Sequence, residues 1–132
     1  MRWFKMTNPF PFPIRYEDAG MRDGKRCIAL TKPLVALTSL GYVEAKAGFI
    51  SDGCSIPKPL WSILGCPFDD YLEESVIHDW LYSENNHDFT RAEADFVFKE
   101  LMWNCGINKA KIAAFYIGLR IGGRKNYKGQ PQ

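Results

Sequence analysis

The chain is organised around the stretch Glu74-Ser75-Val76-Ile77-His78-Asp79-Trp80-Leu81-Tyr82, in which a titratable pair interrupts an otherwise apolar run. Written as a helix, the stretch places His78 and Tyr82 one turn apart, on the face that also carries Ser75. Asp79 lies a step round the helix, toward the Ser75 side. A histidine and an aspartate among apolar residues indicate either a catalytic site or a buried polar pair whose hydrogen bonds are made within the core.

Composition predicts a single domain over residues 1–132. The chain has 132 residues, of which 46% are hydrophobic, and this is enough for one core. The net charge of +2 is close to balance, so no nucleic-acid partner is expected. No stretch approaches the roughly 20 apolar residues of a membrane span, so we expect no transmembrane segment. The four cysteines are widely spaced without a C-x-x-C pair, which favours free thiols in a reducing compartment.

The N-terminal half is predicted to be extended chain followed by β-structure. Residues 1–13 contain three closely spaced prolines, which remove backbone donors and predict an extended arm. The aromatic residues of this arm, Phe10 and Phe12, would either cover a core or lie on a neighbouring protein. Residues 14–57 contain short apolar or alternating runs at 26–30, 34–37, 41–45 and 48–50. Turn residues separate these runs, so the sequence predicts a small antiparallel sheet.

The C-terminal half, residues 58–123, is predicted to be helical. Asp70 and Glu73 form a capping-box pattern at the start of the first main helix, which we expect to end at Asn85-Asn86. Thr90 and Glu93 repeat the pattern at the start of the second helix.

A third helix completes this half. It is predicted to start near Asn108, after Gly106 has ended the second helix, and to stop at Gly122-Gly123. Residues 124–132 are expected to be a basic, solvated tail. The predicted fold class is therefore α+β, with a small N-terminal antiparallel sheet followed by three main helices.

Asp95 is the candidate partner of His78. It lies at the edge of the apolar face of the second helix, where a carboxylate needs a partner. An imidazole held by a buried carboxylate is fixed in tautomer and strengthened as a base, so His78 could remove a proton from water, with Tyr82 hydrogen-bonded to the carboxylate. The alternative is that His78 and Asp95 are a buried polar pair that joins two helices, with Asp79 on the surface or paired to Arg91.

Asp79 points away from that pair and is a candidate metal ligand. The Asp52-Gly53 turn offers a second carboxylate and backbone carbonyls, and calcium accepts such a mixture of oxygens. The alternative is that the turn only connects the sheet to the helices. A zinc site of His78 with Cys54 and Cys66 is a lesser alternative, because the spacing is that of no known ligand set. The second His-Asp dipeptide, His87-Asp88, has no apolar frame and is expected to have no such role.

Three segments together resemble a protein family. Residues 48–57 fit G-F-x-[ST]-D-x-x-S-[IV]-P, residues 78–82 fit H-D-x-L-Y, and residues 91–95 fit R-x-x-A-D. This pattern, from Gly48 to Gly122, resembles a family of small bacteriophage and prophage proteins catalogued as a domain of unknown function. The resemblance implies a phage origin and synthesis in the host cytoplasm, but no activity.

The helical half is also similar to calcium-dependent phospholipases A-two, in the pattern H-D-x-x-Y with a later Asp on the next helix. This resemblance implies that His78 is the general base that activates water and that Asp79 is the calcium ligand. Tyr82 and Asp95 would form the supporting hydrogen-bond network, and Asp52 would stand in the calcium loop. The chain departs from the pattern, because the secreted enzymes have cysteines around the His-Asp pair and a glycine-rich calcium loop that is not recognisable here.

Two function classes remain open on the sequence. One is a metal-dependent hydrolase that acts on lipid or another substrate in the host envelope. The other is a non-enzymatic tail or assembly protein, incorporated in the virion beside other virion proteins, in which His78 and Asp95 are a structural pair.

Overall fold

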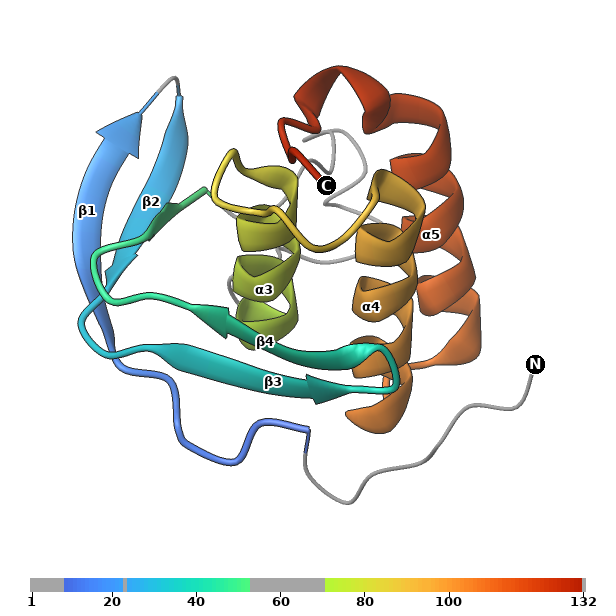
Figure 1. The fold of residues 1–132 in the computed structure, drawn as a ribbon, viewed down its shortest axis with the longest axis horizontal. Helices are drawn as coiled ribbons and strands as arrows, with labels where there is room; N and C mark the ends of the chain where they lie inside the picture. Colours follow the sequence, from blue (N-terminus) through green and yellow to red (C-terminus); the bar gives the residue numbers. More distant parts are fainter. Residues whose placement is uncertain (1–8, 23, 53–70, 132) are drawn as a thin grey trace.

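The computed structural model describes residues 9–22, 24–52 and 71–131. The predictions made for Asp70, Cys54, Cys66 and the start of the helical half lie outside the described residues. Within these ranges the fold is α+β, as predicted: five short strands precede three helices (Figure 1). None of the helices in the described ranges is both long enough and apolar enough to cross a membrane.

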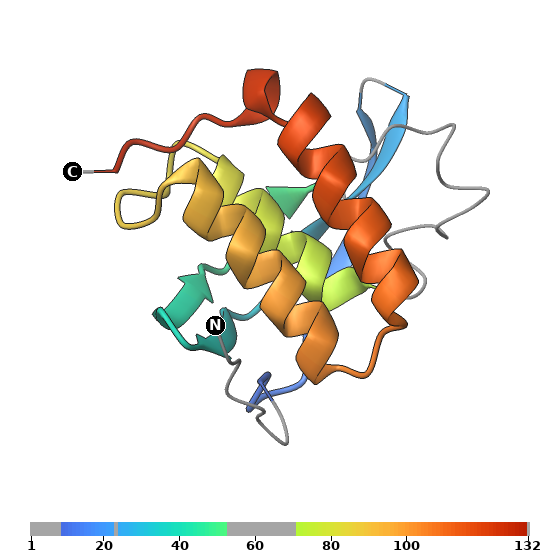
Figure 2. The same cartoon turned by 90° about the vertical axis from the view of Figure 1, so that its right-hand side faces the viewer.

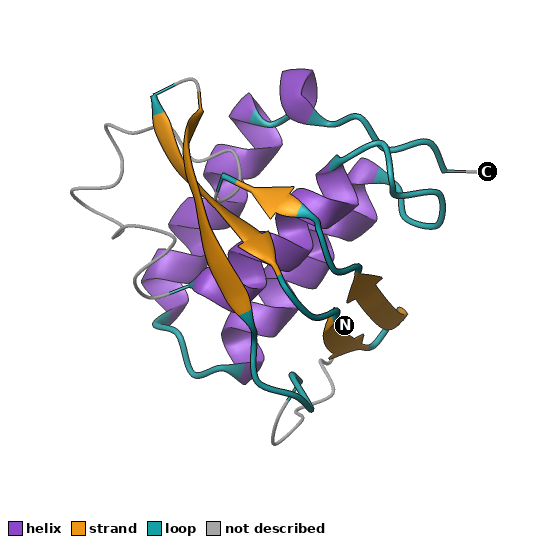
Figure 3. Ribbon diagram, turned by 90° about the vertical axis from the view of Figure 1, so that its left-hand side faces the viewer, coloured by secondary structure: helices purple, strands orange, loops and turns teal. Residues whose placement is uncertain are grey.

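The strands form two antiparallel sheets rather than one. The first has the order β1-β2-β5, from β1 (Tyr16–Arg22), β2 (Lys25–Leu30) and β5 (Ile50–Ser51). The second is the hairpin of β3 (Leu34–Thr38) and β4 (Gly41–Ala45). Figure 3 shows the first sheet crossing in front of the helices, with the hairpin at the lower right beside them.

Strand β1 was not among the predicted runs. It pairs with β2 from Tyr16 opposite Leu30 to Arg22 opposite Lys25, with an irregularity between Asp18 and Gly20. Six of its seven residues are exposed, so it lacks the alternation of apolar and polar residues by which a half-buried strand is recognised. The strand is therefore stabilised by its backbone pairing with β2, and not by burial of its own side chains.

The helices are α3 (Leu72–Tyr82), α4 (Arg91–Asn104) and α5 (Lys109–Gly122). Helix α4 has the predicted capping box, in which Thr90 Oγ1 accepts a hydrogen bond from Glu93 N and Glu93 Oε1 accepts one from Thr90 N. Helix α5 begins after Asn108, as predicted, with the Asn108 side chain accepting from Ala110 N. Both helix starts therefore follow from residues within three positions of the cap.

The start of α3 is described only from Tyr71 onward, since the predicted capping residue Asp70 lies outside the described residues. Tyr71 occupies the cap position, and it makes no side-chain cap hydrogen bond. The Tyr71 ring is buried and packs edge-on against Phe115 of α5, with 5.1 Å between ring centroids. The residue before the first turn of α3 is thus held by the packing of its ring against α5. No local sequence pattern reveals this contact.

Helix α4 separates two hydrophobic clusters. One lies between the β3–β4 hairpin and the α3–α4 pair, and includes Leu34, Val43, Ile77 and Leu101. Phe10 of the N-terminal arm also joins this cluster, whereas Phe12 is exposed.

The other cluster packs α4 against α5 and contains Tyr71, Phe98, Met102, Ile112, Phe115 and Leu119. Figure 2 shows α4 and α5 side by side on the helical side of the molecule. The second half of α3 lies next to α4, and the candidate site is located between these two helices.

The C-terminal residues are not the free tail that was predicted. After the short helix η2 (Arg124–Asn126), Lys128 N donates to Tyr82 O at 2.7 Å and Gln130 N donates to Asn86 O at 2.8 Å. Tyr127 OH donates to Phe89 O. Residues 127–130 therefore hold the end of α3 and the loop that follows it, although the side chains of Arg124 and Lys128 are exposed.

Candidate functional site

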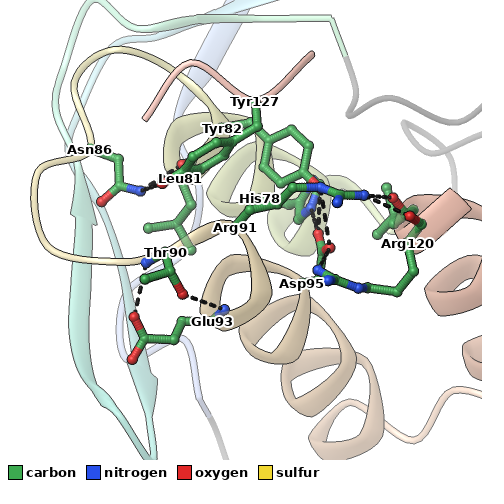
Figure 4. Close-up of polar contacts among 11 residues, drawn as sticks. His78, Leu81, Tyr82, Asn86, Thr90, Arg91, Glu93, Asp95, Arg120 and Tyr127 are labelled. Atoms are coloured by element: carbon green, nitrogen blue, oxygen red, sulfur yellow. Dashed lines mark hydrogen bonds and ion pairs between the residues drawn. The ribbon is translucent and has the colours of Figure 1, made fainter. Parts of the chain in front are cut away.

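His78, Tyr82 and Asp95 meet between α3 and α4, as the sequence predicted (Figure 4). His78 Nε2 lies 2.9 Å from Asp95 Oδ1, and Tyr82 OH donates to the same oxygen at 2.6 Å. His78 and Tyr82 are one turn apart on α3, and their ring centroids are 4.2 Å apart. The side chains of His78 and Asp95 are completely buried, so two titratable groups lie in the core in direct contact.

Two arginines complete the surroundings of Asp95, and neither was predicted as its partner. Arg120 Nη1 of α5 donates to Asp95 Oδ2 at 2.9 Å. Arg91 Nε donates to Tyr82 OH at 3.3 Å and lies 4.0 Å from Asp95 Oδ2. The sequence offered an Asp79–Arg91 pair as one alternative. In the structure, Arg91 contacts Tyr82 and Asp95 instead. The spacing of four between Arg91 and Asp95 is a local signal for this pair, but no local pattern relates Asp95 to Arg120.

The end of α5 is fitted closely against this cluster. Arg91 Nη2 donates to the backbone oxygens of Leu119 and Arg120, at 2.6 and 2.9 Å. A Cβ atom at Gly123 would lie 2.7 Å from Tyr82 OH and 2.5 Å from Leu119 O, so only glycine fits there without a shift. The cluster thus joins α3, α4 and α5.

The charges of the cluster follow from burial and hydrogen bonding. Burial lowers the pKa of His78 and outweighs the opposing effect of Asp95. Burial raises the pKa of Asp95, but hydrogen bonds from His78, Tyr82 and Arg120 outweigh it, and the resulting pKa is below its usual value. The pKa of Tyr82 is raised by burial and by its hydrogen bond to Asp95. At neutral pH the cluster therefore holds a neutral imidazole, an ionised carboxylate and a neutral phenol.

These charges determine which nitrogen of His78 carries the proton. Asp95 is an acceptor only, so Nε2 of the neutral ring must be the donor. Nδ1 is then an acceptor with a free lone pair, and although it is buried it has no hydrogen-bond partner among the described residues. A buried polar atom without a partner is uncommon and calls for an explanation. This orientation, with the carboxylate behind one nitrogen and a lone pair on the other, is the one that a general base requires.

Asp79 and Asp52 lie together in a cleft of about 640 Å³. Asp52 N donates to Asp79 Oδ2 at 3.2 Å, which brings the end of β5 next to α3. The cleft is also lined by Tyr82 of the buried cluster and by the exposed cations Arg22 and Lys128. Asp52 and Asp79 therefore line the same cleft, on the side of α3 that faces β5.

The described residues contain no group of three or more His, Cys, Asp or Glu side chains that could hold a metal ion. Asp52 and Asp79 by themselves supply carboxylate oxygens, which suit a hard cation such as calcium. Calcium takes six to eight oxygens, so backbone carbonyls and water would have to supply the others. The chemistry of the donors fits calcium, and the two carboxylates would be part of its ligand set.

The remaining titratable residues named from the sequence lie apart from the cluster. His87 and Asp88 are exposed in the loop between α3 and α4, and Asp88 N donates to Asn86 Oδ1. The Cys27 side chain is buried, whereas Cys105 lies at the surface with its thiol partly covered. This partial burial raises the pKa of the Cys105 thiol to about 12, with Glu74 and Glu73 adding to the shift, so the thiol is unreactive at neutral pH.

The family model described as "Protein of unknown function (DUF1353)" matches residues 28–119 of the chain. The chain therefore belongs to this family. Two curated relatives come from Sinorhizobium fredii (strain NBRC 101917 / NGR234). "Uncharacterized protein y4iH" is 37% identical over 79 residues, which are 58% of this chain and 32% of the relative. "Uncharacterized protein y4jT" is 60% identical over 30 residues, which are 22% of this chain and 9% of the relative.

The chain thus spans about a third or less of the length of these relatives. No solved structure matches it. The matched range includes α3 and α4, with His78, Tyr82 and Asp95 of the buried cluster, and ends one residue before Arg120.

Proposed function

We propose that this member of the family is a hydrolase in which His78 is the general base that activates water. The observation that carries the proposal is the state of the His78 ring: Nε2 donates to an ionised Asp95, while the buried Nδ1 has a lone pair and no partner in the part of the chain that the structure describes. A structural role would be served better by a ring with both nitrogens hydrogen-bonded, because an unsatisfied buried acceptor costs about 1–3 kcal/mol.

The reaction that fits this arrangement is hydrolysis of an ester. Nδ1 takes a proton from water as the water oxygen attacks the carbonyl carbon, and the imidazolium returns the proton to the departing alkoxide, which leaves an acid and an alcohol. Asp95 stabilises the imidazolium and holds the ring in orientation, and Tyr82 and Arg120 hold Asp95. Because His78 is completely buried here, the reaction requires a rearrangement that admits water to Nδ1.

Calcium is proposed as the cofactor, with Asp79 and Asp52 among its ligands. What supports this is the position of the two carboxylates in one cleft beside Tyr82, and the suitability of their oxygens for a hard cation. Calcium at this position would supply electrostatic stabilisation for the negative charge that develops on the carbonyl oxygen.

The setting that we propose is a bacteriophage infection. The sequence pattern from Gly48 to Gly122 supports a phage origin, synthesis in the host cytoplasm, and a lipid substrate in the host envelope. The chemistry of the cluster is compatible with either a free enzyme or a hydrolase carried in the virion.

A structural virion protein is the second candidate function. It is favoured by the way in which Asp95 accepts hydrogen bonds from α3 and α5 while it belongs to α4, so that one carboxylate joins three helices. In that case the cluster serves to stabilise the fold, and other virion proteins are the partners.

The first test is a calcium titration monitored by thermal unfolding of the full chain. A cation that binds only the folded protein stabilises it by about 2.7 kcal/mol at a concentration of 100 times Kd. We expect calcium to raise the Tm of the wild type and not that of Asp79→Ala. Asp88→Ala is the matched control, because Asp88 follows the second histidine in an exposed position, and it should respond as the wild type does.

The second test is release of fatty acid from phospholipid vesicles. His78→Gln should abolish turnover, and His87→Gln, the matched control, should retain it. Folded wild type that shows neither a calcium-dependent Tm nor any ester hydrolysis would overturn the hydrolase, and would favour the structural function.

A further inference from the structure

The buried His78 ring lies in a row of aromatic rings that leads to the surface. Its centroid is 4.2 Å from that of Tyr82 and 5.0 Å from that of Phe98. Phe98 belongs to the cluster that packs α4 against α5, so opening the structure on that side would separate two helices. On the other side, the centroid of the partly exposed Tyr127 ring is 5.3 Å from that of Tyr82. The route from solvent to His78 that disturbs least of the core therefore passes Tyr127 and Tyr82.

A short segment after η2 holds the end of α3 on this route. We call residues 127–130 the strap. Lys128 N donates to Tyr82 O at 2.7 Å, and Gln130 N donates to Asn86 O at 2.8 Å. Figures 1 and 2 show the chain running from the end of α5 to the loop that follows α3. The strap therefore lies against both the last residue of α3 and the loop after it.

The hydrogen bond from Lys128 N acts on the residue that covers His78. Helix α3 ends at Tyr82, and the last carbonyl groups of a helix have no partner within the helix. The strap supplies this partner for Tyr82 O. Helix ends without such partners fray. Loss of the strap would therefore leave the last turn of α3 able to fray, and Tyr82 would move away from His78 with it.

The strap is held by few contacts. Lys128 and Gln130 are exposed, and Tyr127 and Gly129 are only partly buried. Besides its ring contact with Tyr82, Tyr127 donates from its hydroxyl to Phe89 O at 2.7 Å. Segments with little buried apolar surface and exposed backbone hydrogen bonds open at a lower free-energy cost than the core. The strap should therefore open while the helices stay packed.

We propose that the strap closes the candidate site, and that its release from the end of α3 admits water to His78. Release would also join His78 to the cleft that contains Asp52 and Asp79, because Tyr82 and Lys128 line that cleft. The inference rests on the proposed function, since a general base needs water and His78 is completely buried with the strap in place. Access to His78 is measurable without substrate, so the strap and the hydrolase can fail separately.

The experiment measures the reaction of the two histidines with diethyl pyrocarbonate, which modifies a neutral imidazole. His87 is exposed and gives the rate of an accessible ring in the same chain. His78 reacts only in molecules in which its cover has opened. Mass spectrometry of the peptides that contain each histidine gives the two rates. The ratio of the His78 rate to the His87 rate therefore follows the population of the open state.

Lys128→Pro removes the N–H group that donates to Tyr82 O. Tyr127 has φ −77° and ψ 120°, a conformation that a residue before proline adopts, so the backbone there accommodates the change. We expect the ratio of the His78 rate to the His87 rate to rise about threefold or more, because one hydrogen bond of the closed state is lost. Lys128→Ala is the matched control. It keeps the N–H group and loses only an exposed side chain, so its ratio should equal that of the wild type.

Gly129→Ala tests the strap without removing a donor. A Cβ atom at Gly129 would overlap the ring and hydroxyl of Tyr127, so alanine has to displace this ring from its place beside Tyr82. We expect the ratio of the two rates to rise in this variant too. Hydrogen exchange at the amides of Leu101 and Met102 in α4 reports whether the opening is local, and both should stay as protected as in the wild type.

Two results would overturn the proposal. The first is a ratio that Lys128→Pro and Gly129→Ala leave unchanged, because the cover over His78 would then not depend on the strap. The second is a rise in the ratio that is matched by an equal rise in exchange at Leu101 and Met102, which would indicate general unfolding. Faster reaction of His78 with protected α4 amides but no ester hydrolysis would support the strap and count against the hydrolase.

Discussion

Arg120 Nη1 donates a hydrogen bond to Asp95 Oδ2 at 2.9 Å, across 25 residues of sequence. The other oxygen of the same carboxylate, Oδ1, accepts from Tyr82 and contacts His78. One buried carboxylate therefore determines both how the His78 ring is oriented and how the end of α5 is attached to α4. The two roles can be separated by variants that remove one contact at a time.

Asp95→Asn should destabilise the fold by about 3 kcal/mol, because it removes the charge that compensates Arg120 and offers an NH2 group where a second acceptor is needed. Urea unfolding followed by circular dichroism measures the change. Asp18→Asn is the control, since the Asp18–Arg26 pair is exposed on both sides, and it should alter stability by less than about 1 kcal/mol. Equal effects of the two substitutions would contradict the role given to Asp95.

Acid should weaken the contribution of His78 to stability. Its pKa is lowered in the folded protein, so below about pH 6.5, the ordinary value of a histidine, the unfolded chain binds a proton that the folded protein does not. The contribution is complete above that pH and is lost as the pH falls toward the lowered value. We expect the difference in unfolding free energy between wild type and His78→Gln to shrink from pH 7.5 to pH 5.5, as measured in urea. A difference that is constant over this range would argue against a buried neutral imidazole.

Glu74 should act in the opposite sense. Burial, with a smaller contribution from Glu73, raises the pKa of Glu74 to about 7, so the folded state keeps a proton that the unfolded state has lost between about pH 4.5 and 7. Its favourable contribution is therefore present at low pH and is lost as the pH rises through 7. Glu74→Gln should match the wild type near pH 4.5 and exceed its stability at pH 8 by up to roughly 3 kcal/mol. Thermal unfolding at the two pH values tests this.

The control for Glu74 is Glu84→Gln, which changes an exposed carboxylate after α3 and should shift stability by less than about 0.5 kcal/mol at either pH. A Glu74→Gln variant that gained nothing at pH 8 would show that the buried carboxylate is not costly there.

Asn86→Ala should cost about 2–4 kcal/mol, whereas Asn85→Ala should cost less than about 1 kcal/mol. The buried Asn86 side chain donates to Leu81 O and Phe89 O and accepts from the backbone nitrogens of Asp88 and Phe89. Among the described residues, the exposed Asn85 donates to Ser83 Oγ alone. Urea unfolding compares the two variants. Similar costs for both would contradict the role of Asn86 in holding the loop.

Much of the site was predictable because it depends on spacing along one helix and on a second helix with an apolar face. His78 and Tyr82 are neighbours on any helix that contains both, and Asp95 had to find a partner because its neighbours Phe98 and Met102 are buried. A shared role of Asp52 and Asp79 was expected on weaker grounds, and the hydrogen bond from Asp52 N to Asp79 Oδ2 joins the two residues through the backbone of Asp52. Whether the cluster performs hydrolysis, and whether calcium binds, stay predictions.

The arginine partners of Asp95 illustrate what the sequence did not reveal. Arg91 was considered only as a partner of Asp79, although its spacing from Asp95 is that of neighbours on a helix. Arg120 lies in the predicted third helix, and no partner was predicted for it. Its position beside Asp95 depends on the packing of Phe115 and Leu119 against Phe98 and Met102, which sets how α5 crosses α4.

The sequence by itself determined the α+β class, the capped starts of α4 and α5, and the face that His78 shares with Tyr82. Each of these depends on residues within about four positions of one another, where hydrogen bonding and helical periodicity act directly. The tertiary structure alone decided the pairing of the exposed strand β1, the place of Tyr71 at the start of α3, the attachment of residues 127–130 to α3, and the contact of Arg120 with Asp95. These features depend on which surfaces meet when the core is buried, and that choice is made by the packing of the whole chain rather than by any segment of it.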